Sequence, residues 1–184
     1  METNTKKKDL RPVFGFLIKL ALWYSVTSVL YNYLVVESPK ALNPFLALIT
    51  SQATDILSWL GYNADWAHIE AGHVIFLDSI LSVFVNEGCS AGKLYLLFFS
   101  LIFSFGGRLK DMAWFVPMGL ASVYVLNLLR IAYLSIVAYK YPTYFKLNHD
   151  YVVVIVLYGF MFLLWYMWIN KYAIRVNANQ ADET

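Results

Sequence analysis

Four long apolar blocks constrain this chain more than any other feature of its sequence. A transmembrane helix needs about 20 mostly apolar residues to cross the roughly 30 Å of hydrocarbon in a bilayer. The blocks lie at residues 13–36, 90–107, 112–139 and 151–170. Of all residues, 60% are apolar and only 14% are charged, whereas soluble domains have about 25% charged residues. The sequence therefore predicts an all-α polytopic membrane protein with about four transmembrane helices, and it argues against a soluble enzyme.

The basic residues near the ends of these blocks predict the topology. They gather at residues 6–11, 108–110 and 171–175. With four spans, these three clusters share one side of the membrane, which the positive-inside rule assigns to the cytoplasm. Both termini are therefore expected in the cytoplasm, with the segment 37–89 on the outer face. Residues 1–176 are expected to form a single membrane domain, followed by a disordered tail at 177–184.

The outer segment 37–89 carries patterns of secondary structure. Residues 44–60 predict an amphipathic helix that either lies on the outer membrane surface or packs on the helix bundle. Residues 73–77 and 81–85 are rich in β-branched and aromatic side chains and predict a short β-hairpin. This hairpin leads the chain to residues 86–90, at the mouth of the second span.

Three side chains capable of chemistry are expected at one depth of the membrane. Cys89 begins the second span on its outer side, and His149 precedes the fourth span. Arg130 lies about 16 residues into the third span from its inner end, which at about 1.5 Å per residue places it just under the outer surface. This topology brings a thiol, a guanidinium and an imidazole to one level, but it does not show that they touch.

These residue types suit acyl transfer. A helix N-terminus and a nearby arginine favour the thiolate of a cysteine, and an arginine can also stabilise the oxyanion of a tetrahedral intermediate. His149 could take the thiol proton and return it to a leaving amine. Each residue also has a simpler interpretation. Cys89 could be a small buried apolar residue, His149 a solvated group, and Arg130 a side chain that reaches the outer headgroups.

Two further residues are candidates for a supporting role. Asn127 lies one helical turn before Arg130 and is expected either to hydrogen-bond its guanidinium or to join two helices. Glu87 lies two residues before Cys89. It is expected either to orient Arg130 or His149, or to be a solvated carboxylate.

Ser90 belongs to a competing motif. Residues 88–92, Gly-Cys-Ser-Ala-Gly, match the G-x-S-x-G pattern of the hydrolase nucleophile elbow. That fold needs a large soluble sheet and an acidic residue between the serine and the histidine, and this chain offers neither. We therefore expect Ser90 to lie at the N-terminus of a helix, beside the reactive group.

Composition argues against several other classes of site. The single cysteine excludes an intramolecular disulfide and a CxxC redox pair. His68 and His73 flank Glu70, but no third ligand is evident, so neither a metal site nor another cofactor is expected. The net charge is +2, and no basic cluster is interleaved with aromatic residues, which argues against nucleic acid as a partner.

Three short blocks of the sequence form a recognisable set. They are Glu87-Gly-Cys-Ser-Ala91 at the start of one span, Asn127-Leu-Leu-Arg-Ile131 inside the next, and His149-Asp150 before the last. Together they resemble the exosortase/archaeosortase family of membrane-embedded cysteine transpeptidases, over roughly residues 77–158. The resemblance implies that Cys89, Arg130 and His149 are the catalytic residues. It departs at Ala91, where the family often has glycine.

The resemblance also implies a substrate and a place of action. Members of the family process exported proteins that carry a C-terminal tail made of a short motif, a transmembrane helix and a basic cluster. The chain is then expected in the bacterial cytoplasmic (inner) membrane, among its lipids, with the active site facing outward. There it would cleave the tail and transfer the protein to an acceptor. Because the chain is as short as the compact members, its substrate-docking helices are expected to be reduced or supplied by a small membrane partner protein.

A different class of function fits the same spans. A non-catalytic scaffold or assembly protein could use Arg130 to bind a partner helix or a lipid, because a charge within a span needs a partner. In such a protein the Cys89 thiol would have no role.

Overall fold

The computed structural model describes residues 11–37, 39–70 and 72–173. Its helices are α1 (Arg11–Tyr31), α2 (Pro39–Trp59), α3 (Gly92–Phe105), α4 (Leu109–Lys140), α5 (Phe145–Leu147) and α6 (Val153–Trp168). Its strands are β1 (Ala64–Ile69), β2 (Gly72–Leu77) and β3 (Ile80–Val85). Short 3₁₀ and π-helical turns lie between them, at Asn32–Val36, Glu87–Cys89, Pro142–Tyr144, Asn148–Val152 and Ile169–Ala173. The prediction of a mostly helical polytopic membrane protein with a small β element is confirmed.

Three helical segments are long and apolar enough to cross a membrane: Val13–Val36, Leu109–Lys140 and Pro142–Tyr172. They correspond to the first, third and fourth predicted spans. The second predicted span is shorter than expected, because α3 has only 14 residues. At about 1.5 Å per residue this is roughly 21 Å, less than the hydrocarbon thickness. The helix ends where Gly106 and Gly107 take positive φ angles of 74° and 153°.

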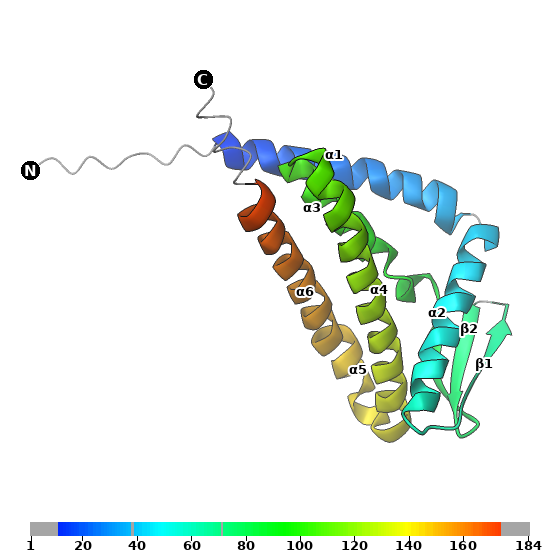
Figure 1. The fold of residues 1–184 in the computed structure, drawn as a ribbon. Helices are drawn as coiled ribbons and strands as arrows, with labels where there is room; N and C mark the ends of the chain where they lie inside the picture. Colours follow the sequence, from blue (N-terminus) through cyan, green and yellow to red (C-terminus); the bar gives the residue numbers. More distant parts are fainter. Residues whose placement is uncertain (1–10, 38, 71, 174–184) are drawn as a thin grey trace, which may run out of the picture.

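The long helices form the frame of the molecule. Figure 1 shows α4 and α6 side by side, with α1 crossing near one end of the pair and α2 and the sheet beside α4 toward the other. Helix α3 packs along α1 and also contacts α4 and α6. The predicted tail at 177–184 lies outside the described residues, as do residues 6–10 of the basic N-terminal cluster.

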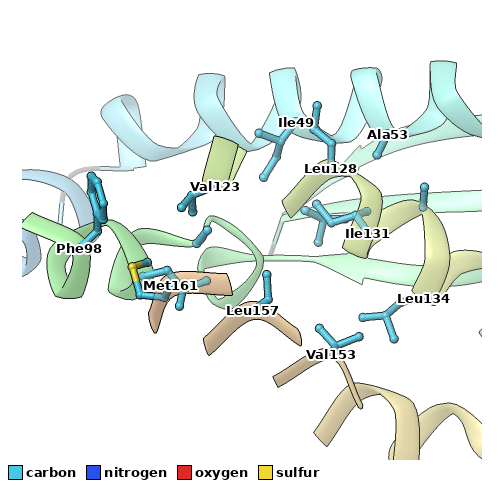
Figure 2. Close-up of a cluster of buried hydrophobic side chains, with 14 of the residues drawn as sticks. Ile49, Ala53, Phe98, Val123, Leu128, Ile131, Leu134, Val153, Leu157 and Met161 are labelled. Atoms are coloured by element: carbon cyan, nitrogen blue, oxygen red, sulfur yellow. The ribbon is translucent and has the colours of Figure 1, made fainter. Parts of the chain in front are cut away.

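One apolar core joins the helices and the outer layer. Figure 2 shows buried side chains from four helices converging on it, among them Ile49 of α2, Phe98 of α3, Ile131 of α4 and Leu157 of α6. The helix pair α3 and α4 is especially close at Gly119, where an added Cβ would overlap the Phe98 ring. Helix α2 is therefore part of the packed bundle, which is one of the two placements expected for the amphipathic helix.

The predicted hairpin is confirmed as β2 and β3, whose antiparallel register pairs Leu77 with Ile80. The turn residues Asp78 and Ser79 both have positive φ angles, 51° and 64°, as a tight two-residue hairpin turn requires. A third strand, β1, was not predicted; it pairs with β2 in the sheet order β1-β2-β3.

The sheet is attached to the last turns of α4. The Ser82 hydroxyl donates a hydrogen bond of 2.6 Å to the Ser135 carbonyl. The Tyr139 hydroxyl donates one of 2.7 Å to the Asp78 carboxylate. Strand β3 runs from this contact toward Cys89. The attachment of the sheet to α4 therefore sets the position at which the chain enters α3.

His73 is the buried ionisable group of the sheet. It is only 2% exposed, and its ring lies 5.5 Å from that of Trp66 and 4.8 Å from that of His68. Its Nδ1 has no hydrogen-bond partner among the described residues. Burial, and secondarily the charge of His68, lower the pKa of His73 below its ordinary value of 6.5.

Acid is therefore expected to weaken the fold through His73. The unfolded chain takes up a proton near pH 6.5, whereas the folded chain does so only at a lower pH, so stability falls as the pH drops through this window. Thermal unfolding in detergent at pH 8 and pH 5.5 should show a smaller pH dependence for His73→Phe than for wild type. His68→Gln should keep most of the dependence, because burial is the larger cause. Equal pH dependence in wild type and His73→Phe would contradict this assignment.

Candidate active site

Cys89 ends the 3₁₀ turn Glu87–Cys89, which joins β3 to α3. The Asn86 side chain accepts a hydrogen bond of 3.0 Å from the Gly88 N–H, and the Cys89 N–H donates one of 2.9 Å to the Asn86 carbonyl. The Cys89 Sγ lies 3.8 Å from the Phe84 carbonyl oxygen. The thiol is partly exposed, so it is accessible on a turn whose backbone is fixed at both ends.

Asn127 ties this turn to α4. Its side chain is fully buried, and its Nδ2 donates a hydrogen bond of 2.8 Å to the Cys89 carbonyl oxygen. Of the two roles expected for Asn127, the structure shows the one that joins two elements, because its amide N–H reaches the Cys89 backbone and not Arg130. The Oδ1 atom has no hydrogen-bond partner among the described residues.

Ser90 follows the cysteine and begins the approach to α3. It is buried, and its Oγ accepts a hydrogen bond of 3.1 Å from the Gly92 N–H. The same Oγ lies 3.2 Å from the Tyr31 hydroxyl of α1. A nucleophile elbow exposes its serine, whereas here the hydroxyl is engaged at the start of a helix. Ser90 lies two residues before α3, and its side chain binds the first N–H of that helix.

Ala91 takes the left-handed conformation that turns the chain into α3. Its φ and ψ angles are 58° and 14°, a region that glycine enters without strain and alanine enters at a small cost. This is the position at which the resemblance departs from its usual pattern. The backbone requirement explains why glycine is the natural residue there.

Arg130 lies one turn beyond Asn127 on α4, between two hollows. One is a cavity of about 170 Å³, lined partly by Glu87, Lys93 and Tyr158. The other is an apolar groove of about 250 Å³ between α4 and α6. The Arg130 Nε is buried and has no hydrogen-bond partner among the described residues. No ion pair joins this guanidinium to a carboxylate in the described part of the chain. The side chain as a whole is only partly buried, so its charge is open to a ligand.

His149 lies on the π-helical turn Asn148–Val152, just before α6. Its Nδ1 is 2.8 Å from a carboxylate oxygen of Asp150, and its side chain is 43% exposed. Its ring stacks on Phe145 at 5.7 Å. The Asp150 contact orients the imidazole and leaves Nε2 free to exchange a proton.

The structure gathers Asn127 and Ser90 at the turn of Cys89 and places Arg130 beside Glu87. The Cys89 side chain lines neither hollow at Arg130, and His149 lies apart. Asn127 contacts the Cys89 turn, and Glu87 shares a cavity with Arg130. No hydrogen bond or ion pair joins His149 to Cys89 or Arg130 within residues 72–173. Its turn is nevertheless attached to α4 near Arg130. There the Tyr133 hydroxyl donates a hydrogen bond of 2.5 Å to the Asn148 side chain.

Several residues of the site were missed in the sequence. Tyr31 lies at the end of α1, and Lys93 and Tyr158 line the Arg130 cavity. Tyr31 and Tyr158 belong to apolar helices in which nothing along the chain distinguishes them. Two residues carry a visible signal: Lys93 is a charge within an apolar block, and Asp150 is an acidic residue next to a candidate histidine. For metal binding, no group of three or more His, Cys, Asp or Glu side chains is close enough among the described residues.

Comparison with known proteins gives one match, to the family model described as transmembrane exosortase (Exosortase_EpsH), over residues 13–168. The chain belongs to the transmembrane exosortase family. The match runs from α1 to the end of α6, and it therefore includes Cys89, Arg130 and His149. No curated protein and no solved structure matches the chain.

The left-handed backbone conformation of Ala91 leads to a prediction about the stability of this exosortase. Ala91→Gly should change the free energy of unfolding by less than about 1 kcal/mol, since relief of strain offsets the added freedom of the unfolded chain. Ala91→Val should lower it by about 2 kcal/mol or more, because a β-branched residue strongly disfavours positive φ. The matched control Ala121→Val, on an exposed face of α4, should cost less than about 1 kcal/mol. Equal losses in the two valine variants, measured by unfolding in detergent, would refute the conformational argument.

Proposed function

We propose that this exosortase is a cysteine transpeptidase or protease that cleaves C-terminal sorting tails from exported proteins and transfers those proteins to an acceptor. In this proposal it acts at the outer face of the bacterial cytoplasmic membrane, with both termini in the cytoplasm. The observation that carries the proposal is the placement of the Cys89 turn. A buried asparagine of α4 holds this turn, one helical turn from an arginine that has no ion-pair partner in the described chain.

The proposed chemistry uses Cys89 as the nucleophile. Its thiol gives a proton to His149, and the sulfur then attacks the carbonyl carbon of the scissile peptide bond. Arg130 stabilises the resulting oxyanion. The C–N bond breaks, the leaving amine takes a proton from His149, and a thioester remains on Cys89. An acceptor amine or hydroxyl, or water, then attacks the thioester and regenerates the thiol.

In this mechanism the His149 imidazole must come within hydrogen-bond distance of the Cys89 thiol. Catalytic hydrogen bonds often form only when substrate is bound, so we propose that the turn carrying His149 closes toward Cys89 over the bound peptide. The Asp150 carboxylate, 2.8 Å from Nδ1, stabilises the imidazolium that forms.

The hollows beside Arg130 suit the two parts of a sorting tail. In this proposal the cavity lined partly by Glu87, Lys93 and Arg130 takes the short motif. The apolar groove continues inward along α4 and α6. Two of its lining residues, Leu126 and Leu129, also line a third hollow that reaches Met118 and Phe160. We propose that the apolar helix of the tail lies along this groove with its basic end toward the cytoplasm, and that membrane lipids or a small partner protein cover its other side.

Processing of a tail-bearing envelope protein is the direct test. Co-expressed wild-type protein should shorten it on an immunoblot, Cys89→Ala should abolish shortening, and His149→Ala should reduce it strongly. Ser90→Ala should slow processing without abolishing it, because Ser90 is not the nucleophile. Normal processing by Cys89→Ala would rule out the thiol mechanism.

The alternative function is a scaffold in which Arg130 binds a partner helix or an anionic lipid. Among the described residues the Arg130 guanidinium has no ion-pair partner, and it lies beside an apolar groove, which supports a scaffold as much as it supports catalysis. Arg130→Lys separates the two functions, because lysine keeps the charge but loses the planar set of donors. A catalytic role predicts a loss of processing of about 10²-fold, whereas a scaffold predicts near-normal complementation of a deletion strain. The expected result is the loss, with the protein still present at wild-type level in membranes.

A further inference from the structure

Tyr31 links the first span to the turn that carries Cys89. It is the last residue of α1. Its hydroxyl lies 3.2 Å from the Oγ of Ser90, the residue that follows Cys89. One hydroxyl from a distant helix therefore contacts the end of the turn that leads into α3.

The Ser90 hydroxyl joins Tyr31 to the start of α3. Its oxygen accepts a hydrogen bond of 3.1 Å from the Gly92 N–H, and it lies within hydrogen-bond distance of the Tyr31 hydroxyl. A hydroxyl can both donate and accept, so one serine side chain links the backbone at the start of α3 to the end of α1.

The position of the tyrosine ring depends on the absence of a side chain at Gly92. A Cβ added there would lie 2.5 Å from Tyr31 Cζ and would overlap the hydroxyl. The ring therefore packs directly on the first backbone turn of α3. Its position is set by this contact as well as by the hydrogen bond with Ser90.

We propose that Tyr31 is a positioning residue of the active site, which holds the turn of Cys89 in its reactive geometry through Ser90. The inference rests on the proposed cysteine chemistry and adds α1 to the elements that build the site.

The test uses the full-length protein in nanodiscs. Because Cys89 is the only cysteine, alkylation by iodoacetamide reports on that thiol alone, and its rate can be followed from pH 6 to pH 9. Tyr31→Phe removes the hydroxyl and keeps the ring. Tyr33→Phe is the matched control, because the Tyr33 ring is 70% exposed and lies two residues further along the same span.

Tyr31→Phe should shift the pH profile of alkylation and lower kcat for tail cleavage by about tenfold, the usual effect of losing one hydrogen bond near a reacting group. KM should change little, and Tyr33→Phe should match wild type in both assays. Ser90→Ala should reproduce the effect, and the double variant should be no slower than either single variant, because both break the same chain of bonds.

An unchanged alkylation profile in Tyr31→Phe, with unchanged kcat, would overturn the proposal. Additive losses in the double variant would overturn it too, since they would place the two hydroxyls in separate roles. Thermal unfolding of each variant distinguishes loss of reactivity from loss of fold, and Ser90→Ala tests the same bonds if Tyr31→Phe does not fold. A failure of the proposed function can be told apart from a failure of the proposal on Tyr31. If the proposed function is wrong, Cys89→Ala would still process tails. The alkylation profile of Cys89 would still report on the role of Tyr31.

Discussion

The hydrogen bond from Asn127 to the Cys89 carbonyl is the contact on which the site depends. Between the end of β3 and the start of α3 the backbone leaves both sheet and helix while it lies against the membrane helices. Unpaired backbone groups are costly in such surroundings. The bond of 2.8 Å from a fully buried side chain satisfies one of them. It also fixes Cys89 against α4, the helix that carries Arg130.

The remaining architecture supports this turn from three sides. The sheet is held to the end of α4 through Ser82 and Asp78. It therefore fixes the position at which the chain reaches Cys89. Helix α1 contacts the turn through Tyr31. Helix α6 closes the Arg130 cavity and, through the turn that precedes it, carries His149. A short α3 fits this plan, because it only has to begin at the reactive turn and pack between longer helices.

Elements with a strong periodic or compositional pattern were predicted well. The hairpin was visible because residues 73–77 and 81–85 are β-branched and aromatic, and three long helices were visible because their blocks are apolar. Strand β1 was missed because none of its residues is fully buried and it mixes polar with apolar residues. The alternation of the core-facing Ala64 and Trp66 with exposed neighbours is therefore weak in the sequence. The start of α3 was placed too early because apolar residues alone do not show that the chain turns at Ala91.

The order of the helices follows from the amino-acid sequence alone, because apolar length and the placement of basic residues govern insertion into a bilayer. The sequence also predicts one depth for Cys89, Arg130 and His149, but which side chains meet was decided by tertiary packing. Asn127 turns toward a backbone carbonyl, and Tyr31 reaches across from α1. Such contacts depend on how helices rotate and approach one another, and all-apolar helices carry little sequence pattern to specify their rotation.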